Sequence, residues 1–510
     1  MHWFVKFWIV AALIPFWGAV VAVLIHRLQG DSKLESLATP PGSKTPLEST
    51  GEGCLFKAMQ FNRQEQGMQE EVIVVTGNTD VDMPAVRGRL VRSKWARNVL
   101  TFLVVFGPGL IVMEADNDAG AVSTYVQAGA QYGTKLLWLL LWLLPVTYFI
   151  QEMVVRLGIA TGKGHATMIY QRFGKWWGLF SLIDLQLVNF LTLVTEFAAI
   201  ALALGHMNIA PKVGVPVAAA GLMFMVLTGS YRRWERVTVF LCLLDTAWLF
   251  IAFKLRPATW GGVVHDTLVA GLPAGGVTTG LVFLMVAIVG TTIAPWQLFF
   301  QQSCVADKRL RFADLKWSRL DTFLGAVFTI VVAGCMMVAG NAAKLHGLAF
   351  SDPAQLAHDL QPFAGEAVRS GLLLLMINAA VLGTTAISLS SAWAYGEVKG
   401  WPHSLEMPVS KAKGFYATYV VCVALAAAIV LIPGAPLQLI IIGVQVLAGI
   451  MLPSAIIFLQ LLLNDKQVLG DEYVNQPWNN WGNWTIIIVL FILSLILAAQ
   501  VVARNLFPAT

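Results

Sequence analysis

Charged residues are scarce in this sequence. Only 12% of its 510 residues are Asp, Glu, Lys or Arg, whereas about 25% is usual in soluble globular proteins. Apolar residues make up 57% of the chain, and they recur in runs of roughly 20, the length that an α-helix needs to cross a bilayer. The composition excludes an ordinary soluble protein and predicts an all-α polytopic membrane protein in a lipid bilayer.

Histidine is missing from the middle of the apolar runs, because all eight histidines lie in termini, loops or run ends. A proton relay through the membrane would therefore lack the side chain that titrates near neutral pH. The five cysteines have no paired metal-ligand spacing, and we interpret them as packing residues. No nucleophile and base combine at membrane depth, so we predict no enzyme and no bound cofactor.

Eleven apolar spans follow one another from residue 98 onward. A further run at residues 3–25 predicts an N-terminal hydrophobic helix over 1–26, retained and not cleaved. Residues 27–97 are linker-like, and basic residues gather just before the first span, so we expect this segment to be cytoplasmic. The eleven spans lie at about 98–130, 134–160, 177–205, 213–230, 237–255, 275–304, 317–343, 366–397, 411–432, 436–464 and 482–503.

The net charge of +5 is explained by topology. If alternate loops lie on opposite sides, most of the Lys and Arg residues gather on one side, which is the positive-inside bias of cytoplasmic loops. We therefore predict a multi-pass protein of the plasma (inner) membrane, with no nucleic-acid partner.

Two spans contain helix breakers at mid-membrane. The first holds Gly107-Pro108-Gly109 and later Gly120, and the sixth holds Gly290 and Pro295. Breaks five spans apart are typical of an inverted repeat of five plus five helices, with the substrate bound where the broken helices meet. We expect a first repeat at 98–255, an extracellular loop at 256–274, a second repeat at 275–464, and a cytoplasmic loop with an eleventh core helix at 465–510. The alternative, that Pro and Gly only kink these helices, leaves the nearby carboxylates unexplained.

Three acids, Glu114, Asp116 and Asp118, lie beside Asn117 just before the first break. Charged carboxylates at membrane depth cost several kcal/mol and usually line a solute path, so the cluster predicts a cation site. A buried neutral or interfacial acid is the alternative for any one of them. Glu196 in the third span has no partner nearby in sequence, and we expect it close to the site or behind it. Glu152 and Arg156 are interpreted as a structural ion pair.

The donor types indicate the kind of cation. Carboxylate, carbonyl and water ligands suit Mg²⁺, Ca²⁺ and Mn²⁺, whereas soft ligands select softer metals. Mg²⁺ dehydrates reluctantly and is held through one or two carboxylates with several waters retained. The sequence therefore favours Mg²⁺ or Mn²⁺ as the transported substrate over iron or zinc.

Around these residues, over about 98–465, the sequence resembles the NRAMP family of divalent-metal transporters, which have a LeuT-type inverted-repeat fold. The resemblance is carried by four motifs in the expected order: Gly107-Pro108-Gly109, the run from Arg156 to Lys163, Ala294-Pro295, and Gln445-Val446-Leu447 followed by Leu452-Pro453. It implies broken first and sixth core helices and transport by alternating access.

The sequence departs from this family at the residues that bind metal. Where the family has Asp-Pro-Gly-Asn, this chain has Asp118-Ala119-Gly120-Ala121; where the family has Met-Pro-His, it has Ala294-Pro295-Trp296. Gln301 and Leu193 replace a further histidine and an aspartate linked with proton movement. These losses are similar to the NRAMP-related magnesium transporters, which carry Mg²⁺ and Mn²⁺ without proton coupling.

The resemblance implies a role for each candidate residue. Asp118 would be a carboxylate ligand, Ala115 and Thr291 would offer backbone carbonyls, and Asn117 and Gln445 would contact the hydrated ion. Glu114 and Asp116 would add negative potential, and Ala294 would leave room for a hydrated ion, with Glu196, Trp296 and Gln297 placed around them. Two alternatives remain: a proton-coupled Mn²⁺/Fe²⁺ importer, and a non-transporting sensor or scaffold.

Overall fold

The computed structural model describes residues 102, 105–273 and 275–506, and every regular element in these residues is a helix. Among these residues, eight helices or helix pairs are long and apolar enough to cross a membrane, and Pro211–Leu227 is a shorter apolar helix. These features confirm the predicted all-α polytopic class. The predicted helix at 1–26 and linker at 27–97 lie outside the described residues.

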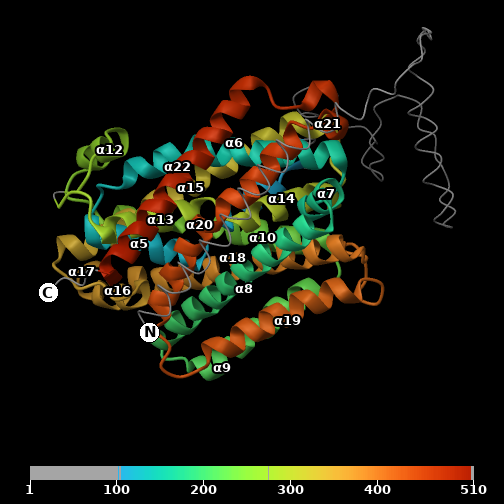
Figure 1. Cartoon of the computed structure of the whole chain (residues 1–510). Coiled ribbons are helices and arrows are strands. Elements are labelled where there is room, and N and C mark those ends of the chain that lie inside the picture. Colours follow the sequence, from blue (N-terminus) through green and yellow to red (C-terminus); the bar gives the residue numbers. More distant parts are fainter. Residues whose placement is uncertain (1–101, 103–104, 274, 507–510) are drawn as a thin grey trace, which may run out of the picture. The chain divides into compact units, whose positions relative to one another are not determined.

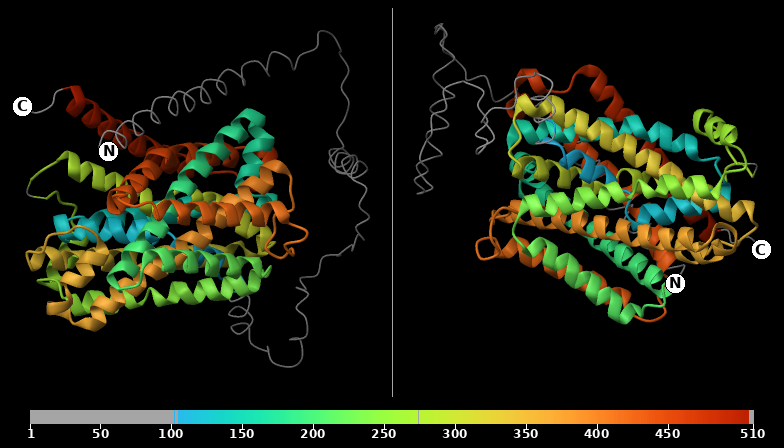
Figure 2. Two further views of the ribbon diagram at one scale, coloured as in Figure 1. Left: turned by 90° about the horizontal axis from the view of Figure 1, so that it is seen from below. Right: turned by 180° about the vertical axis from the view of Figure 1, so that it is seen from behind.

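The helices form a bundle whose long members run side by side (Figures 1 and 2). The connecting helices α12, α16 and α17 lie at one end, here the α16 end, and α7 and α21 lie at the other, here the α7 end. In chain order the helices are α4 (Pro108–Glu114), α5 (Ala119–Tyr132), α6 (Leu137–Thr161), α7 (His165–Phe173), α8 (Lys175–His206), α9 (Pro211–Leu227), α10 (Tyr231–Leu244), α11 (Ala247–Leu255), α12 (Trp260–Leu268), α13 (Thr279–Thr292), α14 (Pro295–Asp307), the 3₁₀ turn η1 (Phe312–Asp314), α15 (Leu315–Leu345), α16 (Pro353–Asp359), α17 (Gln361–Ala364), α18 (Glu366–Lys399), α19 (Lys413–Val430), α20 (Leu437–Leu463), α21 (Lys466–Tyr473) and α22 (Pro477–Leu506).

The first and sixth spans are broken, as predicted. α4 ends at Glu114 and α5 begins at Ala119, because Asp118 adopts an extended backbone and caps α5. α13 ends at Thr292 and α14 begins at Pro295, after an extended linker at Ile293 and Ala294. Proline fits this first helical position because its missing N–H has no partner to lose there.

The fifth span is also interrupted, which the sequence analysis did not predict. α10 ends at Leu244 and α11 begins at Ala247, with Asp245 and Thr246 in turn geometry between them. Neither residue is Gly or Pro, so the sequence carried no breaker signal there.

Small residues bring α5 close to α15. A Cβ added at Gly129 would lie 2.0 Å from the carbonyl oxygen of Met337, and one added at Gly340 would lie 2.0 Å from that of Val126. Small residues at helix contacts allow this close backbone approach in membrane proteins. The second half of the first broken helix is thereby fixed against α15.

α15 also holds the first half of that broken helix. The Asp321 carboxylate of α15 accepts hydrogen bonds from the backbone N–H groups of Gly107, Gly109 and Leu110, at 3.3, 2.7 and 3.2 Å. These N–H groups have no partner within their own helix. Both halves of the first broken helix are thus set by α15.

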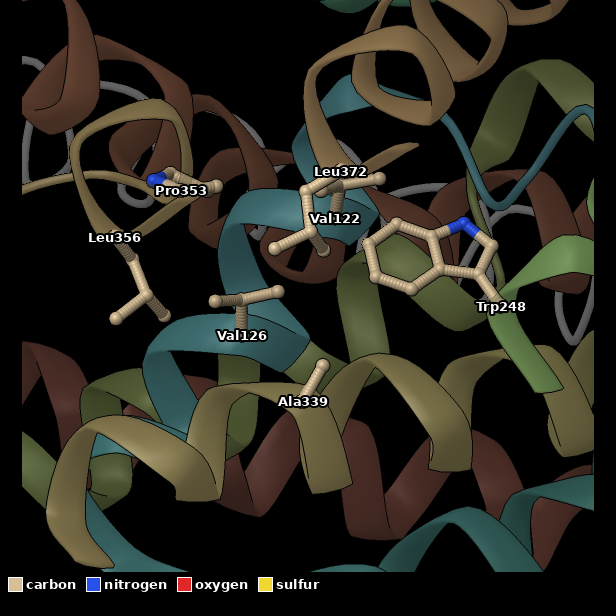
Figure 3. A pocket seen from close by; sticks show the side chains of 7 residues that line it. All are labelled: Val122, Val126, Trp248, Ala339, Pro353, Leu356 and Leu372. Atoms are coloured by element: carbon tan, nitrogen blue, oxygen red, sulfur yellow. The ribbon is translucent and has the colours of Figure 1, made fainter. Parts of the chain in front are cut away.

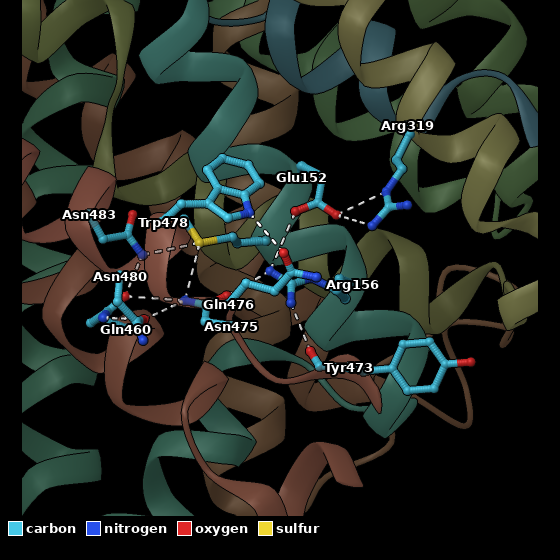
Figure 4. Close-up of polar contacts among 11 residues, drawn as sticks. Glu152, Arg156, Arg319, Gln460, Tyr473, Asn475, Gln476, Trp478, Asn480 and Asn483 are labelled. Carbon is cyan, nitrogen blue, oxygen red and sulfur yellow. Dashed lines mark hydrogen bonds and ion pairs between the residues drawn. The ribbon is translucent and has the colours of Figure 1, made fainter. Parts of the chain in front are cut away.

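A polar network joins helices near the α7 end of the bundle (Figure 4). Glu152 of α6 lies 3.5 Å from Arg156 and accepts two hydrogen bonds, of 2.9 and 2.6 Å, from Arg319 of α15. Arg156 also donates to the carbonyl oxygen of Tyr473 and to Asn475. The predicted ion pair of Glu152 and Arg156 is confirmed, and it connects α6, α15 and the segment after α21.

Candidate metal site

Asp118 lies at the break of the first core helix. Its Oδ1 accepts a 2.8 Å hydrogen bond from the backbone N–H of Ala121, so the carboxylate caps the N-terminus of α5. Its side chain is almost completely buried. The free N–H groups and the dipole of a helix N-terminus favour a negative charge, which helps a carboxylate to remain in this position.

Glu196 of α8 reaches the same helix end from a different span. Its Oε2 accepts a 3.1 Å hydrogen bond from the backbone N–H of Ala119, and its carboxyl group lies within hydrogen-bonding reach of Asp118. Its other oxygen, Oε1, is buried without a partner. Two acids from distant parts of the chain therefore share the N-terminus of α5.

Both breaks release a backbone carbonyl. In a continuous helix the N–H of Ala119 would bond to the carbonyl of Ala115, but here it bonds to Glu196. The carbonyl of Thr291 loses its helical donor because residue 295 is proline, which has no N–H. Each break thus supplies a carbonyl oxygen that is free of its helical bond.

Asp116 lies in the unwound segment with both carboxylate oxygens buried and without a hydrogen-bond partner. It faces Gln297 of α14, whose Nε2 is also unpartnered. The Gln297 Oε1 accepts a 3.1 Å hydrogen bond from Gln151 of α6. Unpartnered carboxylate oxygens at this depth are costly in free energy unless a bound cation or a water molecule interacts with them.

Gln445 of α20 lies against the start of α5, because a Cβ added at Gly120 would overlap its Nε2 and lie 3.0 Å from the Oδ1 of Asp118. The Nε2 of Gln445 and the Oγ1 of Thr291 are both buried and unpartnered. Only glycine at position 120 lets α20 approach this closely.

Asp116, Asp118 and Glu196 have no basic partner, since none of the Lys, Arg or His residues in the described part of the chain pairs with them. Nor do three His, Cys, Asp or Glu side chains converge tightly enough there to hold a metal by themselves. A cation at the breaks would depend on one or two carboxylates completed by carbonyl, amide and water oxygens. Hard divalent cations, Mg²⁺ above all, accept such a donor set.

Two of the candidate residues face away from Asp118. Asn117 donates to Glu114 and to the carbonyl oxygen of Thr329, at 3.2 and 3.1 Å, and Thr329 donates to Glu114. Both side chains therefore point toward α15. Their assignment as metal contacts stays a prediction.

The remaining candidates lie on the sixth core helix. Ala294 is buried in the extended linker, and Trp296 is buried against Phe300, with ring centroids 6.0 Å apart. The Ser390 hydroxyl of α18 donates to the carbonyl oxygen of Trp296. Trp296 thus packs toward α18 and shapes the surroundings of the site.

Sequence reasoning missed two residues beside the site. Gln151 is an uncharged polar residue inside a span, a signal that could have identified it. Gly383 of α18 is the other, since a Cβ there would lie 2.8 Å from both the Cβ of Asp118 and the Oε2 of Glu196. No local pattern distinguishes this glycine from the others.

Two cavities lie toward the α16 end. The larger, of about 560 Å³, is lined by residues of α5, α8, α13 and α20 and by Asp352 before α16. The smaller, of about 10 Å³, is surrounded by apolar side chains from α5, α11, α15, α16 and α18 (Figure 3). It offers a cation no oxygen ligand, so it is a packing gap.

Comparison with known proteins identifies relatives along most of the chain. The family model "Natural resistance-associated macrophage protein-like" (Nramp) matches residues 109–500. The divalent metal cation transporter MntH of Staphylococcus aureus is 25% identical over 83% of this chain and 97% of its own length. The protein of the same name from Lacticaseibacillus casei is 26% identical over 78% of this chain and 90% of its own.

Solved structures agree on the fold. A crystal structure of the Eremococcus coleocola manganese transporter has a TM-score of 0.68 at 20% identity, covering 83% of this chain and 90% of that one. MhsT in complex with L-phenylalanine has a TM-score of 0.52 at 13% identity, covering 79% of this chain and 98% of that one. These likenesses support the LeuT-type fold, and the family match over 109–500 shows that the chain belongs to the Nramp family.

Proposed function

We propose that the protein carries a partly hydrated divalent cation, Mg²⁺ or Mn²⁺, across the plasma membrane by alternating access and without proton coupling. The observation that carries this proposal is the set of oxygens at the two helix breaks. Asp118 and Glu196 share one helix end, Asp116 has two unpartnered oxygens, and Ala115 and Thr291 have released carbonyls.

The relatives support a divalent metal as cargo, since they are named as divalent metal cation transporters or as a manganese transporter. The preference for a harder and more hydrated ion rests on Ala294. This residue brings no sulfur to the break, and its small side chain leaves water room beside the ion. Mn²⁺ tolerates such a site as well, because it accepts carboxylate, carbonyl and water ligands.

Proton-coupled import of Mn²⁺ is the second candidate, and the position of Glu196 favours it. A buried acid with one unpartnered oxygen beside Asp118 is where a coupled proton would bind. The absence of histidine from the two breaks argues for the uncoupled mechanism, because a carrier of protons near neutral pH is most easily built from that side chain.

Orientation follows from the basic residues. Lys163, Arg172 and Lys466 lie in or beside α7 and α21. Arg319 belongs to the network with Glu152 (Figure 4), and Lys308 follows α14, which contacts α7 through Gln302. All five therefore lie toward the α7 end of the bundle. By the positive-inside bias we infer that this end is cytoplasmic, together with the 27–97 segment, and that the α16 end faces outward.

The test is uptake into proteoliposomes that contain a Mg²⁺-sensitive dye, with a parallel Mn²⁺ assay and an internal pH reporter. Mg²⁺ entry without acidification supports the proposal. Mn²⁺ entry with acidification and without Mg²⁺ flux supports proton-coupled import of Mn²⁺ instead. Absence of flux for both ions, in protein that still binds them, indicates a sensor or scaffold.

The site itself is tested by Asp118→Asn, which keeps the cap on α5 but removes the charge. We expect uptake to fall at least tenfold while the protein remains folded. Asp471→Asn is the matched control, because it removes an exposed carboxylate at the α7 end. Normal uptake by Asp118→Asn would contradict the site assignment.

A further inference from the structure

The cavity of about 560 Å³ at the α16 end contains an unusual group of amide side chains. Gln127 and Gln131 of α5 and Gln438 of α20 line it, and most of the other lining residues are apolar. Asp352, which caps α16 through the N–H of Gln355, adds a carboxylate to the lining. The lining is therefore mainly apolar, with one group of amide side chains and a single carboxylate.

Two of these glutamines bridge helices across the cavity. The Nε2 of Gln438 donates a 3.2 Å hydrogen bond to the Oε1 of Gln127. The Oε1 of Gln438 is buried and has no partner. A buried amide oxygen without a donor is costly, and a ligand that carries N–H or O–H groups would satisfy it.

The bridge lies in line with the metal site. Gln438 and Gln445 are seven residues apart on α20, as Gly120 and Gln127 are on α5. Seven residues are nearly two helical turns, so each pair lies on one face and about 10 Å apart along the helix. The contact of Gly120 with Gln445 beside Asp118 is thus repeated two turns nearer the cavity by Gln127 and Gln438.

The size and chemistry of the cavity fit a fully hydrated cation. Six waters occupy about 180 Å³ at roughly 30 Å³ each, well below the volume of the cavity. Neutral amides are poor substitutes for the hydration shell of Mg²⁺, which dehydrates reluctantly. Amide oxygens can, however, accept hydrogen bonds from waters that remain on the metal.

We propose that Gln127 and Gln438 form an outer holding site for the hydrated divalent cation, before the ion loses water at Asp118. The site contacts the ion only through its hydration waters, which donate to the amide oxygens. The hydrogen bond between the two glutamines must open before the ion can pass. This inference rests on the proposed transport of a divalent cation.

The probe for this site is hexaamminecobalt(III), a cation of about the size of hexahydrated Mg²⁺ whose ligands do not exchange. It can occupy a site that recognises an intact shell but cannot bind Asp118 directly. We expect the wild-type protein to bind it in detergent titrations. Gln438→Leu should weaken that binding at least fivefold and leave the Mn²⁺ affinity within about twofold, which also shows that the variant is folded.

Asp118→Asn should show the opposite pattern. We expect this variant to lose Mn²⁺ binding and to keep the binding of hexaamminecobalt(III). Gln127→Leu serves as a second variant from the other side of the bridge. Equal binding of the complex by wild type and both Leu variants would overturn the outer site, as would loss of its binding in Asp118→Asn. Unchanged Mn²⁺ binding and uptake in Asp118→Asn would instead contradict the metal site at Asp118. Absence of Mg²⁺ and Mn²⁺ uptake by the wild type would contradict the proposed function, whatever the complex does.

Discussion

Gly383 of α18 controls the space behind the two acids, so Gly383→Ala tests the site without removing a ligand. The added Cβ would lie 2.8 Å from the Cβ of Asp118 and 2.8 Å from the Oε2 of Glu196. Carbon and oxygen atoms are normally separated by more than 3 Å, so α18 or the two acids must move. The Ala119 N–H would then lose its alignment with Glu196.

The magnitude follows from the cost of overpacking, which is about 1–3 kcal/mol for an extra methyl group in a packed interior. If the strain is relieved by moving the two acids, this energy is taken from metal binding. A loss of 1.4 kcal/mol is tenfold in affinity, so we expect the affinity for Mn²⁺ or Mg²⁺ to fall by about fivefold to a hundredfold.

The same helix provides the matched control, Gly371→Ala. The Cβ added there would meet only the side chain of Ile251, at 3.4 Å from its Cδ1 and 4.0 Å from its Cγ1, which is ordinary van der Waals contact. Calorimetric Mn²⁺ titrations and uptake assays of both variants should show a large loss for Gly383→Ala and little change for Gly371→Ala. A folded Gly383→Ala protein with wild-type affinity and uptake would refute the reasoning that the two acids move and that their positions set the metal affinity.

Two further predictions test the preference of the site for hard over soft metal ions and the burial of His165 on α7. Ala294→Met adds a thioether at the second break, so we expect uptake competition to shift toward Mn²⁺ and Cd²⁺ over Mg²⁺; an unchanged order of preference would count against the argument from ligand softness. On α7, burial lowers the pKa of His165 to about 4, although the hydrogen bond to Gln302 raises it. The free energy of unfolding is therefore at its full value above pH 6.5 and falls as the pH falls toward 4, because the unfolded state takes up the proton first. Between pH 7.5 and pH 5, we expect the free energy of unfolding, measured by thermal denaturation, to fall by about 2 kcal/mol more in the wild type than in His165→Gln. An equal dependence of the free energy of unfolding on pH in the two proteins would contradict this.

The sequence predicted the helices well where a breaker or a loop marks their ends. The predicted span 366–397 corresponds to α18 at Glu366–Lys399, and both mid-membrane breaks occur beside the residues expected. Pro295 fixes the second break because it removes a donor and favours the first turn of a helix. The interruption at Asp245 has no such residue, so only tertiary packing could reveal it.

The site was less predictable because the unwound segment changes the direction of its side chains. Continued helical spacing would place Glu114 and Asp118 on one face. In the structure the chain turns between them, so Glu114 bonds to Thr329 while Asp118 caps α5. The link from Glu196 to Ala119 spans 77 residues, and no local pattern indicates such a contact.

The capping of α5 also bears on how an empty carrier could return without a proton. Two facing carboxylates repel each other once a cation leaves, and a proton is one way to relieve that repulsion. Here the backbone N–H groups of Ala121 and Ala119 donate to Asp118 and Glu196. These donors, together with the dipole of α5, offset part of the repulsion between the two acids in this conformation. Because a ligand shifts a conformational equilibrium only by its differential affinity, we expect the proposed contacts of the ion with the carbonyls of Ala115 and Thr291 to distinguish the metal-bound carrier from the empty one.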